Sequence, residues 1–219
     1  MGNRVVDLLR APGPSTSLQE ILYGFIMALI FVYATRFGLL TYDDPVVFIH
    51  VVFGMNATWG VIDAIIFYYL AVCNQRRYVR LVTDGSMERE QRILELMDEF
   101  AATPLDVLSD EDKRWACEAM LDRELQSKEH FRRDRIEMAK SSVGCIIWTL
   151  LTLIPIVLPV LLIEDFDLAL EVASVQSSVI LFFVGYYMGP YLGVNRWLTG
   201  TIMIAISLGI SLIATFTGG

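Results

Sequence analysis

Five long apolar segments constrain this chain more than any other feature of its sequence. A helix rises about 1.5 Å per residue, so about 20 apolar residues are needed to cross the hydrocarbon layer of a membrane. Five segments are of about this length or longer: residues 22–40, 46–73, 143–163, 168–191 and 198–216. We therefore predict an all-α, polytopic membrane protein with five transmembrane helices.

Charged residues gather in one stretch between the second and third apolar segments. Of the 42 charged residues, 29 lie between residues 74 and 140. This distribution argues against a soluble single domain, a disordered chain and a nucleic-acid-binding protein. We expect four regions: a polar N-terminal segment, two transmembrane helices, a helical insert and three further transmembrane helices. Their bounds are residues 1–20, 21–73, 74–140 and 141–219.

The signs of the loop charges predict an orientation in the membrane. Cytoplasmic loops carry an excess of Lys and Arg, and the insert holds 13 of the 17 such residues. We therefore place the insert and the N-terminus, with Arg4 and Arg10, in the cytoplasm. The acidic loops at residues 43–44 and 164–167 then lie on the opposite side, as does the C-terminus.

The sequence offers no known enzyme motif. Cys73, Cys117 and Cys145 lie far apart, which favours free thiols over disulfides or a zinc site. Only two histidines occur, and no P-loop, GxSxG or HExxH motif is present. We expect a protein that is not an enzyme and that holds no tightly bound cofactor.

Asp63 is an acidic residue deep inside a predicted span. A charge at the centre of a bilayer costs a few kcal/mol, so such residues usually face a bundle interior or an aqueous cavity. Asn56, Gly60, Asp63 and Phe67 fall on one helical face. Two interpretations are open: an oxygen-lined path for an ion or proton, or a protonated Asp63 that hydrogen-bonds a neighbouring helix as a structural contact.

Other residues of the predicted spans favour helix packing. Pro155 and Pro159 should kink the third span, because proline lacks a backbone N–H group. Gly185 and Gly189 have the GxxxG spacing that allows close helix approach. The fourth span also carries hydroxyl and amide groups suited to interhelical hydrogen bonds, more often for packing than for a pathway: Ser174, Gln176, Ser177 and Ser178.

The insert has the pattern of short amphipathic helices. One predicted apolar stripe consists of Met87, Ile93, Leu94, Leu96, Met97 and Phe100, and a second of Trp115, Met120, Leu121 and Leu125. Thr103-Pro104 should break the first helix, and Ser109 should cap the second, with Asp112 three residues later. We expect these helices to pack on one another or across a dimer.

Acidic residues of the insert allow two interpretations. Glu95 and Asp98 share a helix face, with Glu99 beside them, and Glu118, Asp122 and Glu124 follow around Met120. Carboxylate oxygens suit divalent cations, and a thioether adds affinity for softer ions such as Fe²⁺. The alternative is a solvated acidic face.

Several stretches together resemble one known family. The third span, VGCIIWTLLTLIPIVLPVLL, is similar to a glycine-containing helix that ends in iPllP, and the C-terminal region has spaced glycines from Gly185 to Gly209. YYLAVCNQRRY, ELMDEF and RWACEAMLDREL are similar to EYlSvrsQre, ELxEIY and a Trp followed by MMxxE. In this order, over about residues 20–218, they resemble the vacuolar iron transporter family.

The resemblance implies a homodimer that exports Fe²⁺, and often Mn²⁺, from the cytosol in exchange for protons. It implies that the insert collects the metal, which then passes between the first two spans of the dimer. Residues of the insert that match the family's ligands are Asp84, Met87, Glu95, Asp98, Met120 and Glu124.

The membrane part departs from the family pattern. Met27 stands where the family has an Asp on the ion path, and Ala64 and Tyr68 replace a Met and a Glu of the second span. We therefore hypothesise a divergent carrier in which Asp63, Asn56 and Met27 form the path. The alternative hypothesis is a non-transporting membrane scaffold whose insert binds a protein partner.

Overall fold

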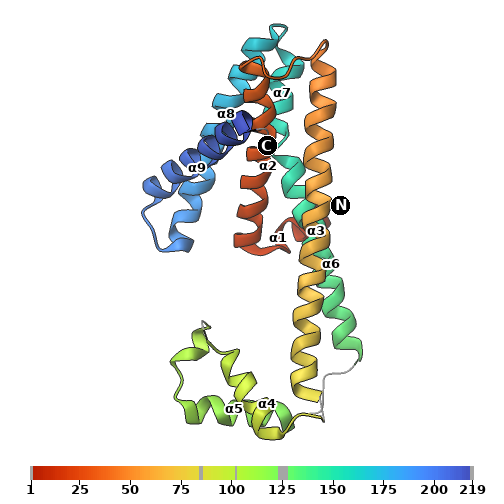
Figure 1. The fold of residues 1–219 in the computed structure, drawn as a ribbon, viewed down its shortest axis with the longest axis vertical. Coiled ribbons are helices and arrows are strands. Elements are labelled where there is room, and N and C mark those ends of the chain that lie inside the picture. The colour runs from red at the N-terminus through yellow and green to blue at the C-terminus, as the bar shows by residue number, and fades with distance from the viewer. Residues whose placement is uncertain (1, 84–85, 102, 123–127, 218–219) are drawn as a thin grey trace. The chain divides into compact units, whose positions relative to one another are not determined.

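The computed structural model describes residues 2–83, 86–101, 103–122 and 128–217, and these ranges contain helices and no strands (Figure 1). The chain divides into two compact units, Met1–Ile66 with Lys140–Gly219 and Phe67–Ala139. The helices α3 (Pro45–Thr83) and α6 (Lys128–Leu151) each contribute to both units. The prediction of an all-α fold is confirmed.

Five candidate membrane spans are found among the described residues, at Gly13–Arg36, Pro45–Leu81, Arg133–Leu162, Phe166–Leu192 and Arg196–Thr217. Each overlaps one predicted segment, so the prediction of five spans is confirmed at the level of length and composition. The first begins nine residues earlier than predicted because α2 (Gly13–Arg36) starts directly after Pro12, within the polar segment. These features are consistent with an integral membrane protein.

The kink predicted for the third span is a break between two helices next to Pro155, whereas Pro159 lies inside the second of them. The helix α6 ends at Leu151, and α7 (Ile154–Leu162) begins three residues later. Pro155 has no backbone N–H group to continue the hydrogen bonds of α6. The last turn is therefore closed by bonds between residues three apart, such as the one from Leu153 N to Leu150 O.

The helices α8 (Phe166–Met188) and α9 (Arg196–Thr217) pack closely where their glycines meet. A Cβ atom added at Gly185 would lie 2.6 Å from Met203 Cγ, and one added at Gly200 would lie 2.8 Å from the ring of Phe182. The close approach predicted from the glycine spacing is confirmed. The glycines serve a contact within this chain.

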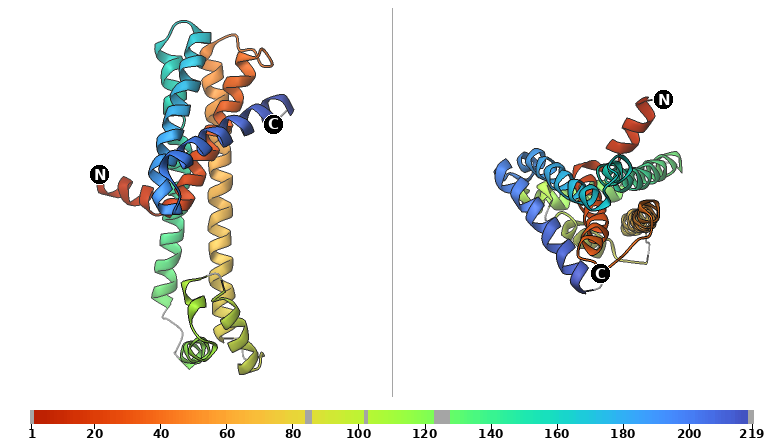
Figure 2. Two further views of the ribbon diagram at one scale, coloured as in Figure 1. Left: turned by 90° about the vertical axis from the view of Figure 1, so that its left-hand side faces the viewer. Right: turned by 90° about the horizontal axis from the view of Figure 1, so that it is seen from above.

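A hydrophobic core holds the first unit together. In Figures 1 and 2, α7 and α8 run side by side and α9 crosses α2 and α8 obliquely. Phe25, Leu29, Phe48, Ile156 and Leu170 are almost fully buried in this core. Of the predicted interhelical serines, Ser174 accepts a bond from Arg36, whereas Ser177 and Ser178 donate to carbonyls of their own helix.

The short helix α1 (Gly2–Arg10) precedes α2 and lies at an angle to it (Figure 2). The indole Nε1 of Trp148 on α6 donates a 2.9 Å hydrogen bond to Leu9 O. A Cβ atom at Gly144 would lie 2.3 Å from Leu8 O, so this glycine lets α1 pack directly on α6.

The second unit contains the helices α4 (Arg89–Asp98) and α5 (Asp110–Asp122), with the 3₁₀ turn η1 (Pro104–Val107) between them. The predicted break at Thr103-Pro104 is confirmed. The predicted cap is also confirmed, because Ser109 Oγ accepts from Asp112 N and donates to its carboxylate.

The small core of the second unit corrects one predicted stripe. Ile93 and Leu96 of α4 are buried as expected, and they pack with Cys117. Trp115 is 72% exposed and Met120 is 41% exposed, so α5 does not bury the face that the larger side chains suggested. The reason is that α5 turns Cys117 toward α4, with Leu121 one turn later packed against the same core. Leu125 lies outside the described residues.

Candidate ion-binding cluster in the membrane-spanning unit

Asn56 joins α3 to α2 in the interior of the first unit. Its side chain is fully buried, and Nδ2 donates a 3.0 Å hydrogen bond to Gly24 O. Its Oδ1 atom has no hydrogen-bond partner among the described residues. The polar side chain of Asn56 therefore faces the bundle, as the helical spacing predicted.

Gly60 continues this face of α3 one turn further on and meets α6. A Cβ atom at Gly60 would lie 3.3 Å from Thr149 Cβ, which is closer than ordinary van der Waals contact, so the two helices pack tightly here. The hydroxyl group of Thr149 donates a 2.6 Å bond to Glu20 Oε2 and lies 3.0 Å from Cys145 O. The helices α2, α3 and α6 thus meet around Thr149.

Glu20 is the polar residue of this cluster that the sequence analysis missed. It was assigned to the polar N-terminal segment, yet its side chain is fully buried on α2. Its carboxyl group is close enough to Asp63 for the two to repel each other electrostatically when both are ionised. One signal could have found it: Glu20 lies one helical turn before Gly24, on the same face of α2.

Asp63 lines a small, mostly apolar pocket and is not sealed in the interior. The pocket has a volume of about 220 Å³ and is lined by Tyr23, Ile26, Met27, Trp59 and Asp63. Two of the three predicted path residues, Met27 and Asp63, therefore lie on one cavity. The third, Asn56, lies two turns before Asp63 on α3 and is turned toward Gly24.

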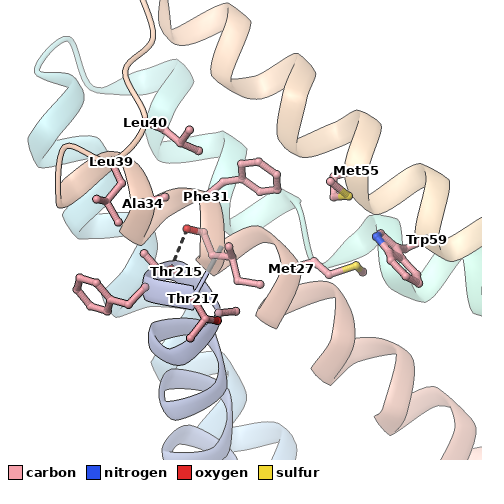
Figure 3. A pocket seen from close by; sticks show the side chains of 12 residues that line it. Met27, Phe31, Ala34, Leu39, Leu40, Met55, Trp59, Thr215 and Thr217 are labelled. Atoms are coloured by element: carbon pink, nitrogen blue, oxygen red, sulfur yellow. Dashed lines mark hydrogen bonds between the residues drawn. The ribbon is translucent and has the colours of Figure 1, made fainter. Parts of the chain in front are cut away.

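A larger apolar groove adjoins the same residues. Its volume is about 850 Å³, and Figure 3 shows side chains from α2, α3 and the end of α9 around it. Met27 and Trp59 line both cavities, so the two are neighbours. At the far wall, Thr215 Oγ1 donates to Ile30 O. The groove offers two thioethers, from Met27 and Met55, but few oxygen atoms.

The described part of the insert holds no group of three His, Cys, Asp or Glu side chains arranged to bind a metal, and the same is true of the other described residues. Glu95 and Asp98 are exposed on α4, and Met120 is exposed on α5, while Met87 is half-buried. Asp84 and Glu124 lie outside the described residues.

Several neighbouring acids of the insert are paired with arginines. Glu99 pairs with Arg77, and Asp122 accepts a 2.7 Å bond from Arg89. Arg114 donates two bonds of 2.6 Å to the carboxylate of Glu90 and contacts Glu118 as well. These bonds lower the pKa of Glu90 below its ordinary value and raise that of Arg114. These acids serve contacts within the unit.

Two comparisons with known proteins found no relative. No protein-family model matches the chain, and no curated protein is detectably similar to it. The resemblance to the vacuolar iron transporter family therefore stays a prediction based on the motifs above.

Proposed function

We propose that the chain is a membrane carrier for a divalent cation, Fe²⁺ or Mn²⁺, that it exports from the cytosol in exchange for protons. The observation that carries this proposal is the position of Asp63, a carboxyl group within a membrane-spanning helix that lines a cavity together with Met27. Ionisable groups at such depth usually mark an ion pathway, because their insertion into lipid is otherwise costly.

The chemistry of this cavity supports a transition-metal ion. A carboxylate supplies a hard, charged ligand, and the thioether of Met27 supplies a soft one, a combination that Fe²⁺ accepts. Asn56 adds an amide oxygen two turns along α3. The insert would bring cations to the membrane through its exposed acids Glu95 and Asp98.

The proposal includes a homodimer and an orientation. The insert and the N-terminus lie in the cytoplasm, and the C-terminus lies on the opposite side, as the loop charges predict. Two copies would meet through α2 and α3, since α3 exposes a long apolar face that includes Met55, Trp59 and Ile66. In this arrangement the cavity of Asp63 would lie near the partner and not in open lipid.

Reconstitution tests the proposal. Purified protein in lipid vesicles should move Fe²⁺ or Mn²⁺ across the membrane faster than empty vesicles, detected with a metal-quenched dye in the lumen. A pH-sensitive dye in parallel vesicles should report proton movement in the opposite direction. Transport of neither ion above the background of empty vesicles contradicts the proposal.

A second candidate function is supported by the surface of the insert. Trp115 is 72% exposed and Val107 is 88% exposed in the second unit. Large exposed apolar side chains are often found at protein-binding surfaces. In this alternative the chain is a membrane scaffold that transports nothing and whose insert binds a protein partner.

Thermal unfolding separates the two functions. A ligand that binds only the folded protein raises its melting temperature. The carrier predicts a rise of several degrees with micromolar Mn²⁺ or Fe²⁺, measured against the same concentration of Mg²⁺. The scaffold predicts no rise and normal folding of Asp63→Asn.

A further inference from the structure

Glu20 has a carboxyl group that the fold leaves half satisfied. Its side chain is fully buried, and Oε2 accepts the hydroxyl proton of Thr149 at 2.6 Å. Its Oε1 atom is buried as well and has no hydrogen-bond partner among the described residues. Buried carboxylate oxygens are almost always bonded to a donor or to a cation, so this atom is unusual.

Asn56 repeats the same pattern on the neighbouring helix. Its Nδ2 group donates a hydrogen bond to Gly24 O, while the buried Oδ1 has no partner in the described part of the chain. The bond to Gly24 fixes the orientation of the amide, with the nitrogen toward α2. The oxygen is therefore left available as a neutral ligand.

The packing of three helices places these groups on neighbouring turns of the bundle. Gly24 lies one turn after Glu20 on α2, and Gly60 lies one turn after Asn56 on α3. Asn56 touches Gly24, and Gly60 packs on the Thr149 that bonds Glu20. Asp63 follows Gly60 by less than one turn, within electrostatic range of the Glu20 carboxyl group.

Two carboxyl groups at this depth without a cation beside them are unfavourable when both are ionised. Each loses hydration, and the like charges repel. A bound cation removes both penalties, and it also gives ligands to the two oxygen atoms that lack partners. A simple packing contact would leave the two buried oxygen atoms without partners.

We propose that Glu20, Asp63 and Asn56 form a binding site for one hard divalent cation, such as Mn²⁺, within a single protomer between α2, α3 and α6. This inference deepens the proposed carrier function and rests on it. The expected ligands are carboxylate and amide oxygens, which suit Mn²⁺ better than ions that require thiolate. Glu20 is the residue that makes the site doubly acidic.

Cys145 tests whether the site binds its cation through oxygen atoms or through sulfur. Its thiol is fully buried, lies one turn before Thr149, and is within electrostatic range of both Glu20 and Asp63. If the site takes a hard cation through oxygen atoms, Cys145→Ala should bind Mn²⁺ like the wild type.

Binding of Mn²⁺ to the purified full-length chain in lipid nanodiscs tests the proposal. The electron paramagnetic resonance signal of free Mn²⁺ is lost on binding, so a titration gives the number of sites and their affinity. Glu20→Gln and Asp63→Asn should each lower the affinity of one site for Mn²⁺ by at least about tenfold. Even the loss of a residue that only supports a metal ligand costs about this much. The control Glu164→Gln, in an exposed loop, should bind like the wild type.

Three results would overturn the proposal: no Mn²⁺ binding to the wild type, wild-type affinity in a folded Glu20 variant, or a loss in Cys145→Ala as large as in Glu20→Gln. If Glu20→Gln does not fold, Glu20→Asp keeps the charge and withdraws the carboxylate by one methylene, and it should bind more weakly. Measurement of metal flux into vesicles distinguishes failure of this site from failure of the carrier function. Transport that persists in Glu20→Gln removes this site but leaves the carrier function standing.

Discussion

The carboxyl group of Glu20 accepts a 2.6 Å hydrogen bond from the hydroxyl group of Thr149, although the two residues are 129 positions apart. The bond joins the first and third membrane-spanning segments inside the bundle, next to the face of α3 that carries Asn56 and Asp63. It fixes one oxygen of the acid and thereby sets the direction of the other.

Replacement of Thr149 tests this contact. Thr149→Val keeps the shape of the side chain but leaves Glu20 Oε2 without its donor, and an unsatisfied buried acceptor costs about 1–3 kcal/mol. Thermal unfolding in detergent should therefore occur at a lower temperature. Thr201→Val is the matched control, because Thr201 is exposed and its hydroxyl group bonds the carbonyl of Trp197 in its own helix. Equal effects of the two substitutions would contradict the account.

The contact between α8 and α9 predicts opposite results for two glycines. Gly185→Ala places a Cβ atom 2.6 Å from Met203 Cγ and 2.7 Å from Thr199 O. Overpacking of this kind costs about 1–3 kcal/mol, so the melting temperature should fall. Gly209→Ala, in the middle of α9, meets nothing within 4 Å and should be neutral or stabilising. A Gly185→Ala protein as stable as the wild type would show that α8 and α9 do not approach closely at Gly185.

The bond between Arg114 and Glu90 predicts a dependence of the insert on pH. Because the pKa of Glu90 is lowered in the folded protein, the bond stabilises the unit above the ordinary carboxyl pKa of 4.5. That stabilisation is lost as the pH falls through the lower folded value. Glu90→Gln should therefore be less stable than the wild type at neutral pH and equal to it in strong acid.

Labelling of Cys117 measures this difference. The thiol is buried in the core between α4 and α5, and burial raises its pKa, so it reacts only when the unit opens. A disulfide reagent that works in acid should label Glu90→Gln faster than the wild type at neutral pH, with Cys73 and Cys145 replaced by serine in both. A rate ratio that does not change with pH would contradict the predicted linkage.

Two apolar residues of the insert should respond differently to truncation. Ile93 is 2% exposed in the small core, so Ile93→Ala should destabilise the unit by about 2–5 kcal/mol, measured as faster labelling of Cys117. Trp115 is 72% exposed, and Trp115→Ala should change the stability by no more than about 0.5 kcal/mol. A large effect of Trp115→Ala would mean that its ring packs against the protein.

The sequence predicted the helices better than their contacts. Length, hydropathy and the prolines Pro155 and Pro159 predict five spans and a kink in the third, because these depend on local properties of the chain. The second insert helix was misjudged because size favoured Trp115 as a core residue. The face that α5 actually buries depends on where α4 lies, which no local pattern records.

The candidate site was predicted in part for the same reason. The spacing of Asn56 and Asp63 places them on one face of a helix, and this required only helical geometry. Glu20 stands at the polar edge of the first apolar segment, where acids usually reach the headgroups. Its burial follows from its contact with Thr149 of α6, more than a hundred residues away, so the sequence around Glu20 offers no more than the one-turn spacing from Gly24 as a signal.

Mn²⁺ uptake into vesicles that hold Asp63→Asn is the most direct test of the carrier function. Asp43→Asn, the same substitution in the exposed loop before α3, is the matched control. The carrier function predicts that Asp43→Asn transports like the wild type, while Asp63→Asn, folded and inserted to the same extent, loses at least about nine-tenths of the rate, as removal of one pathway ligand would cause. Equal rates for all three proteins would show that Asp63 does not lie on the path and would contradict the account.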